Sequence, residues 1–166
     1  MSQHHYTSTV EWTGNLGAGT QSYRAYSRDH TIHVAGKPPI DGSSDPAFRG
    51  DAARHNPEDL FVSSLSACHM LWYLHLCSAN GLVVNRYCDT ASGTLSLNAD
   101  GSGAFSKVIL APEVVLAAGI DEDTRQRAIR LHEAAHRMCF LANSVTFEVS
   151  VEPTVRFEDE TVNTDR

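Results

Sequence analysis

Residues 56–81 read NPEDLFVSSLSACHMLWYLHLCSANG, and this stretch decides the fold. Asn56 is a favoured N-cap, Pro57 fits the first helical position, and Glu58 complements the positive end of a helix. Because Gly81 supplies a C-cap, the spacing predicts a helix from Asn56 to about Asn80. Apolar residues occupy nearly every face, so we expect this helix to be central and buried: Leu60, Phe61, Leu65, Leu71, Trp72, Leu74 and Leu76.

The segments before this helix predict a meander followed by a loop. Residues 4–13 place apolar side chains at even spacing, which is typical of a strand. Residues 21–34 are rich in Tyr, Thr, Ile and Val and predict one or two further strands. Residues 36–55 hold three prolines and three glycines, so we expect a long irregular loop there.

The segments after the helix predict a second sheet and a second helix. Residues 82–99 and 104–116 read as two β segments around a turn at 98–103. A helix is expected from Asp121 to about Cys139, with acidic residues in its first turn. Its expected inward stripe is Ala128, Leu131, Ala135 and Met138.

The C-terminal residues predict one more strand and a tail. Residues 145–157 alternate apolar and polar side chains, which favours a final half-buried strand. Residues 158–166 are polar. We therefore expect a single domain over residues 1–157 and a polar C-terminal tail over 158–166, with an α+β fold.

Composition excludes several classes of protein. The chain has 166 residues, about the size of one ordinary domain, and a formal charge of -7, which argues against a nucleic-acid surface. No run approaches the roughly 20 continuous apolar residues of a membrane span, and residues 1–10 lack the basic and apolar regions of a signal peptide. We expect a cytoplasmic protein that binds neither nucleic acid nor membrane.

The four cysteines are Cys68, Cys77, Cys88 and Cys139, and no CxxC pair is present. In a reducing compartment, such cysteines are either small buried side chains or reactive thiols. Cys68 lies midway along the first helix and Cys139 closes the second, so the two thiols could meet across a helix pair. Neither Cys77 nor Cys88 lies in a motif, and we interpret both as structural.

Two motifs carry a resemblance to a known family. The run Asn56-Pro57-Glu58-Asp59-Leu60, followed by a small-residue helix that reaches Ser66-Ala67-Cys68, resembles the NPE-x-L…C signature of the OsmC/Ohr family. The segment Cys139-Phe140-Leu141-Ala142-Asn143-Ser144 is similar to the second motif of that family. The order of expected elements also matches, over roughly residues 4–157.

The resemblance implies an intertwined homodimer, with two long central helices wrapped by antiparallel β-sheets, that reduces organic hydroperoxides. It implies that Cys68 is oxidised to a sulfenic acid, that Cys139 condenses with it to a disulfide, and that a dithiol such as a lipoylated protein restores both thiols. No bound cofactor or metal is implied. This order of steps fits thiol chemistry, since an oxidised cysteine needs a resolving thiol before it over-oxidises.

Glu58 matches the acidic residue of the family motif. Ten residues at about 1.5 Å rise put it about 15 Å along a helix from Cys68. If both residues belong to one active site, two chains must build that site. The alternative is that Glu58 only stabilises the start of its helix.

One family feature is missing. Members typically carry an arginine near the N-terminal hairpin turn that stabilises the thiolate, but residues 14–19 read GNLGAG. A thiolate needs a nearby cation or helix N-terminus. Arg54 is the favoured substitute because it stands beside the motif and can pair with Glu58. The other candidates are Arg24, Arg28 and Arg49.

Two other functions stay open. His132-Glu133-Ala134-Ala135-His136 is an HExxH sequence, in which two histidines bind zinc and the glutamate activates water. A third ligand is not identifiable, so a zinc hydrolase ranks below the peroxidase, and we expect no bound metal. The missing arginine also leaves room for a non-catalytic dimer that binds an apolar ligand between walls such as Trp72, Tyr73 and Phe140.

Overall fold

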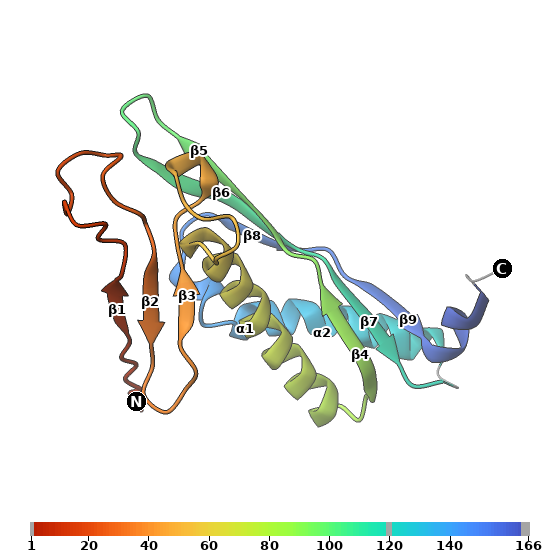
Figure 1. Ribbon diagram of the computed structural model, residues 1–166. Coiled ribbons are helices and arrows are strands. Elements are labelled where there is room, and N and C mark those ends of the chain that lie inside the picture. Colours follow the sequence, from red (N-terminus) through yellow and green to blue (C-terminus); the bar gives the residue numbers. More distant parts are fainter. Residues whose placement is uncertain (1, 119–120, 164–166) are drawn as a thin grey trace. The chain divides into compact units, whose positions relative to one another are not determined.

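The computed structural model describes residues 2–118 and 121–163 (Figure 1). They form two compact units, residues 1–61 and residues 62–166, and the boundary between them lies within the first α-helix. Both units mix strands with helical segments, so the α+β fold class expected from the sequence is confirmed.

The N-terminal unit holds a three-stranded antiparallel sheet in the order β1-β2-β3 (Figure 1). Its strands are β1 (Thr9–Trp12), β2 (His30–His33) and β3 (Ile40–Gly42). His30 pairs with Gly42, where a Cβ atom would lie 2.3 Å from the imidazole, so glycine lets the ring pack over the neighbouring strand.

Three expectations for this unit are corrected. The first strand is shorter than residues 4–13, and only residues 30–33 of the segment 21–34 form a strand. Residues 36–55 are not one irregular loop, because they contain β3 and a short 3-10 helix (Pro46–Phe48) capped by Asp45. The Asp45 carboxylate accepts the Ala47 N–H at 2.7 Å, a local bond that gives this proline-containing segment a regular turn.

Helix α1 (Pro57–Ala79) confirms the helix predicted from the cap signals. The Asn56 side chain accepts the Asp59 N–H at 2.7 Å. The expectation of burial on nearly every face is wrong: the fully buried residues are Leu65, His69, Tyr73 and Cys77, one every fourth position, whereas Leu71 is 64% exposed.

In the described part of the chain, α1 is the one helix long and apolar enough to cross a membrane by length and composition. A core helix of a soluble protein meets the same criterion. Two residues of the buried stripe, Tyr73 and Cys77, belong to the hydrophobic core of the C-terminal unit.

The C-terminal unit holds two three-stranded sheets, in the orders β4-β7-β9 and β5-β6-β8. The two β segments expected over 82–99 and 104–116 each divide into two strands. The first segment divides after Asp89 and the second divides at Ala111. The Asp89 carboxylate accepts the Ala111 N–H at 2.8 Å, and this bond holds the two breaks side by side. The strands are β4 (Val84–Asp89), β5 (Ser92–Leu97), β6 (Gly103–Leu110) and β7 (Pro112–Leu116).

The expected final strand also divides, into β8 (Glu148–Val151) and β9 (Thr154–Phe157). Pro153 lies in the break, where it has no N–H to give to a ladder. Both strands pair in parallel, β8 with β6 and β9 with β7, so the expectation of purely antiparallel sheets is corrected to mixed sheets. The reason is that the chain returns to each sheet after the crossover through the second helix.

Helix α2 (Glu122–Met138) starts where the sequence predicts, and the Asp121 carboxylate accepts the Thr124 N–H at 2.9 Å. Its buried residues are Ala128, His132 and Ala135. The expected stripe is therefore wrong at its end, because Met138 is exposed and His132 is buried in its place. The core joins both helices to β7 and β9.

The C-terminal tail is not without structure. Glu158–Asn163 forms a short 3-10 helix, and the Glu160 carboxylate pairs with Arg125 and accepts the Phe157 N–H at 3.0 Å. Arg125 also donates to the Val155 carbonyl at 2.9 Å. These contacts fasten the segment to α2, and residues 164–166 lie outside the described residues.

Candidate functional site

An apolar cavity of about 380 Å³ opens beside the middle of α1. It is lined by Cys68, Leu71, Trp72, His75 and Phe140. The Trp72 ring meets Phe140 edge to face, with 5.5 Å between ring centroids, and this contact joins α1 to the turn after α2. A cysteine thus lies at the wall of a largely hydrocarbon pocket, which suits an apolar substrate.

The structure brings Cys68 and Cys139 together. Cys68 is partly exposed, whereas Cys139 is 1% exposed at the C-cap of α2, and both are free thiols. The two side chains lie close enough to interact, because Cys68 is among the groups that raise the pKa of Cys139. The sequence was compatible with contact between one thiol from each helix, and the fold places the two thiols together.

The Cys139 thiol is held in its protonated form. Burial first, and then the neighbouring Cys68, raise its pKa to about 11, although the backbone of Ala142 and Leu141 acts in the opposite direction. Burial disfavours the charged thiolate, whereas N–H groups aimed at sulfur favour it.

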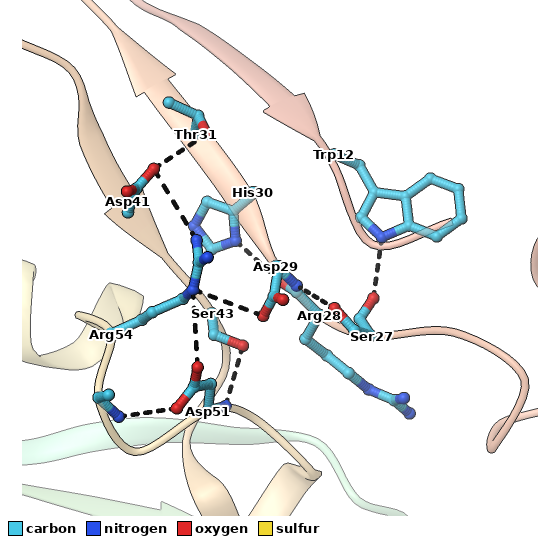
Figure 2. Close-up of polar contacts among 11 residues, drawn as sticks. Trp12, Ser27, Arg28, Asp29, His30, Thr31, Asp41, Ser43, Asp51 and Arg54 are labelled. Carbon is cyan, nitrogen blue, oxygen red and sulfur yellow. Dashed lines mark hydrogen bonds and ion pairs between the residues drawn. The ribbon is translucent and has the colours of Figure 1, made fainter. Parts of the chain in front are cut away.

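Arg54 and Glu58 belong to the N-terminal unit. The Arg54 guanidinium lies 3.7–3.9 Å from carboxylate oxygens of Asp29, Asp41 and Asp51, and Figure 2 shows it pointing into this group of aspartates. The expected partner Glu58 is not among the carboxylates paired with it. Glu58 lies in the first turn of α1, where it fits the capping role.

The remaining candidate arginines have separate surroundings. Arg28 lies over the Tyr23 and Tyr26 rings, 4.1 and 4.3 Å from their centroids, and donates to the carbonyl oxygens of both tyrosines. Arg24 is exposed. Arg49 is exposed and has a left-handed backbone with φ of 67°, at the end of the short 3-10 helix. Which cation serves Cys68 stays a prediction.

The HExxH sequence does not form a zinc site of the usual kind. His132 is 2% exposed, and its Nδ1 lies 3.0 Å from Nε2 of His69 on α1. Glu133 is exposed on α2. Among residues 2–118 and 121–163, no group of three or more His, Cys, Asp or Glu side chains has the arrangement of a metal site.

The other two cysteines lie in different surroundings. Cys77 is buried, and burial raises its pKa. This supports its interpretation as structural. Cys88 is exposed on β4 and does not fill the core. Its packing therefore does not support a structural role.

Fold and site together define an α+β protein in which a free thiol of α1, Cys68, lines an apolar cavity and lies against a second free thiol, Cys139, at the end of α2. The chain belongs to the OsmC family, because the family profile described as OsmC-like protein matches residues 50–154. The resemblance drawn from the two motifs is thereby confirmed. No curated protein sequence matches the chain.

Solved structures support the same assignment. An OsmC-like protein of unknown function from Vibrio cholerae O1 biovar eltor is 33% identical, with a TM-score of 0.82 and coverage of 92% of this chain and 100% of that one. An organic hydroperoxide resistance protein OsmC from Legionella pneumophila is 16% identical, with a TM-score of 0.66 over 94% and 99% of the two chains. OhrB of Bacillus subtilis, an organic hydroperoxide resistance protein, is 20% identical, with a TM-score of 0.61 over 92% and 98%. The last two show the fold alone.

Proposed function

We propose that this protein is a cysteine peroxidase that reduces organic hydroperoxides. The Cys68 thiolate attacks the distal oxygen of the hydroperoxide, the O–O bond breaks, and the leaving alkoxide takes a proton to become an alcohol. Cys139 then attacks the Cys68 sulfenic acid, forming a disulfide and releasing water. An external dithiol reduces the disulfide, and the protein returns to its starting state without a bound cofactor.

One observation carries this proposal: the Cys139 thiol lies against Cys68, and Cys68 lines an apolar cavity. A resolving cysteine has to reach the sulfenic acid before a second peroxide does. A buried thiol already in contact meets that need without a large movement. Two structural relatives are named as organic hydroperoxide resistance proteins, which agrees with this chemistry.

The lining of the cavity favours an alkyl or aryl hydroperoxide over hydrogen peroxide. Leu71, Trp72 and Phe140 offer hydrocarbon contacts to the organic group, and these contacts contribute binding free energy in proportion to the area that they bury. Hydrogen peroxide offers no such area.

We further propose a cytoplasmic homodimer in which Glu58 of one chain serves the site of the other. The proposal rests on the axial distance of about 15 Å between Glu58 and Cys68 along one helix. Light scattering should give about twice the chain mass. A stable monomer with full peroxidase activity would contradict the shared site.

The test of the catalytic pair is oxidation with one equivalent of an alkyl hydroperoxide, followed by mass spectrometry of the linked peptides. We expect a Cys68–Cys139 disulfide, one alcohol released per disulfide, and the same outcome in a Cys88→Ser control. A disulfide that includes Cys77 or Cys88 in place of this pair overturns the assignment. Binding of an apolar ligand without any turnover of peroxide would instead favour the non-catalytic dimer.

A further inference from the structure

The buried stripes of the two helices meet through histidines. Every buried residue of α1 lies four positions from the next, and two of them are His69 and Tyr73. The buried stripe of α2 consists of Ala128, His132 and Ala135. His132 is therefore the single large side chain that α2 buries, and alanines stand on both sides of it.

His132 is held on two sides by α1. Its Nδ1 lies 3.0 Å from Nε2 of His69, and its ring stacks on Tyr73 with 3.7 Å between centroids and 13° between planes. We call the contact between the two imidazoles the histidine bridge. Both residues are almost completely buried, at 0% and 2% exposure, so water does not compete for this hydrogen bond.

Both rings of the histidine bridge are neutral near pH 7. Burial, and to a smaller extent a neighbouring histidine, lowers the pKa of His69 to about 4 and that of His132 to about 3. The neighbour is His136 for His69, and it is His69 for His132. One ring therefore donates an N–H and the other accepts it. His69 Nδ1 and His132 Nε2 have no hydrogen-bond partner within the described residues.

A purely apolar contact would avoid the cost of these two unpartnered nitrogens, so packing alone does not account for the pair. A hydrogen bond differs from an apolar contact because it is directional. It is satisfied at one register of α1 against α2 and lost when either helix slides or turns. The histidine bridge thus selects one register out of several that hydrocarbon packing would tolerate.

The same register determines whether the two thiols meet. Cys68 directly precedes His69, and Cys139 follows His132 by seven residues, which is about two helical turns and returns to nearly the same side of α2. A slide of α2 along α1 would move Cys139 by the same amount. We propose that His69 and His132 are positioning residues whose hydrogen bond holds Cys139 against Cys68 for disulfide formation.

This inference rests on the proposed function only for the use of the disulfide in turnover. Disulfide formation itself is measured without peroxide, by equilibrating the protein with mixtures of reduced and oxidised dithiothreitol. In that exchange both protein thiols lose their protons and electrons to the oxidised reagent, which becomes the dithiol. Failure of the wild type to reduce peroxide would refute the proposed function and leave this test intact.

The decisive variants are His132→Phe and His132→Asn. Phenylalanine keeps an aromatic ring for Tyr73 and removes the hydrogen bond, whereas asparagine loses the ring and keeps a polar atom near the position of Nδ1. We expect His132→Phe to lower the equilibrium constant for the Cys68–Cys139 disulfide about tenfold, and His132→Asn to stay within about threefold of the wild type. The free thiols are quantified by alkylation and mass spectrometry.

A packing role predicts the opposite order, with His132→Phe equal to the wild type and His132→Asn impaired. That result, or equal behaviour of the two variants, overturns the proposal. If His132→Phe fails to fold, the pair His69→Leu and His69→Gln gives the same comparison from α1, because glutamine places its amide near the position of Nε2. Thermal unfolding of the reduced proteins checks that each variant compared is folded.

Discussion

Cys68 and His69 are neighbours on α1, yet they lie in opposite surroundings. Cys68 is partly exposed at the wall of an apolar cavity, whereas His69 is completely buried against α2. One residue corresponds to about 100° of rotation around a helix. Neighbouring positions on one helix can therefore meet two different requirements. In the proposed roles, the thiol has to be reached by substrate and the positioning histidine has to be shielded from water.

The largest effect is expected at Cys68, the partly exposed residue of this pair. Replacing Cys68 by Ser should abolish the consumption of alkyl hydroperoxide, because a hydroxyl is a far weaker nucleophile than a thiolate. A coupled assay with a dithiol reductant measures it, with Cys88→Ser as the matched control that keeps full activity. Turnover by the Cys68→Ser variant would remove Cys68 from the mechanism.

Replacing Cys139 by Ser should separate the two chemical steps. We expect one oxidation event at Cys68, followed by conversion to sulfinic acid and no further turnover, since the resolving thiol is absent. Mass spectrometry of the Cys68 peptide at increasing peroxide should show additions of two oxygens in the variant and a disulfide in the wild type. Sustained turnover in the variant would show that another thiol resolves the sulfenic acid.

The buried histidines, His69 and His132, should make the free energy of unfolding depend on pH. The folded protein holds His69 and His132 with lowered pKa values of about 4 and about 3, whereas both take up a proton near pH 6.5 when the chain unfolds. The unfolded state then binds more protons, so the free energy of unfolding should fall as pH drops below 6.5. Each histidine contributes a slope of about 1.4 kcal/mol per pH unit down to its folded pKa.

Urea unfolding between pH 7 and pH 4.5 measures this slope. His132→Asn should remove about half of the histidine contribution. If the stability of the wild type stays constant over this range, the two rings take up protons in the folded protein. The two histidines would then not be shielded from water as the comparison with Cys68 requires.

The smallest effect is expected at Arg54. If Arg54 stabilises the Cys68 thiolate, Arg54→Met should slow alkylation of Cys68 by iodoacetamide about tenfold. Arg86→Met, at an exposed arginine of β4 that is not among the candidates, is the matched control. The three aspartates around Arg54 leave the alternative that it only balances local charge, in which case both variants should react alike and Arg54→Met should lose about 1 kcal/mol of stability or less.

Local signals in the sequence predicted part of this protein well. The predicted cap at Asn56 starts α1 with its side-chain oxygen, and α2 starts at the predicted position, where Asp121 is the cap. Such signals work because a cap bonds to a backbone N–H only a few residues away. The two motifs around Cys68 and Cys139 likewise identified the family before any geometry was known.

Contacts between distant residues were beyond the reach of the sequence. The breaks in the β segments depend on the bond between Asp89 and Ala111, and the parallel pairing of β8 and β9 depends on where the chain returns after α2. The inward side of α2 was predicted from hydrophobicity, which favours Met138 over His132. No local pattern shows that a histidine will be buried when its partner lies 63 positions away.

The sequence by itself determined the two helices, the cysteine on each of them and membership of the OsmC family, because these follow from short-range capping and from compact motifs. The tertiary structure was needed to show that the two thiols lie against each other, that Cys68 lines an apolar cavity and that the His132 ring contacts His69. The physical reason is that burial and hydrogen-bond partners are properties of packed surfaces, and packing brings together residues that the sequence keeps apart.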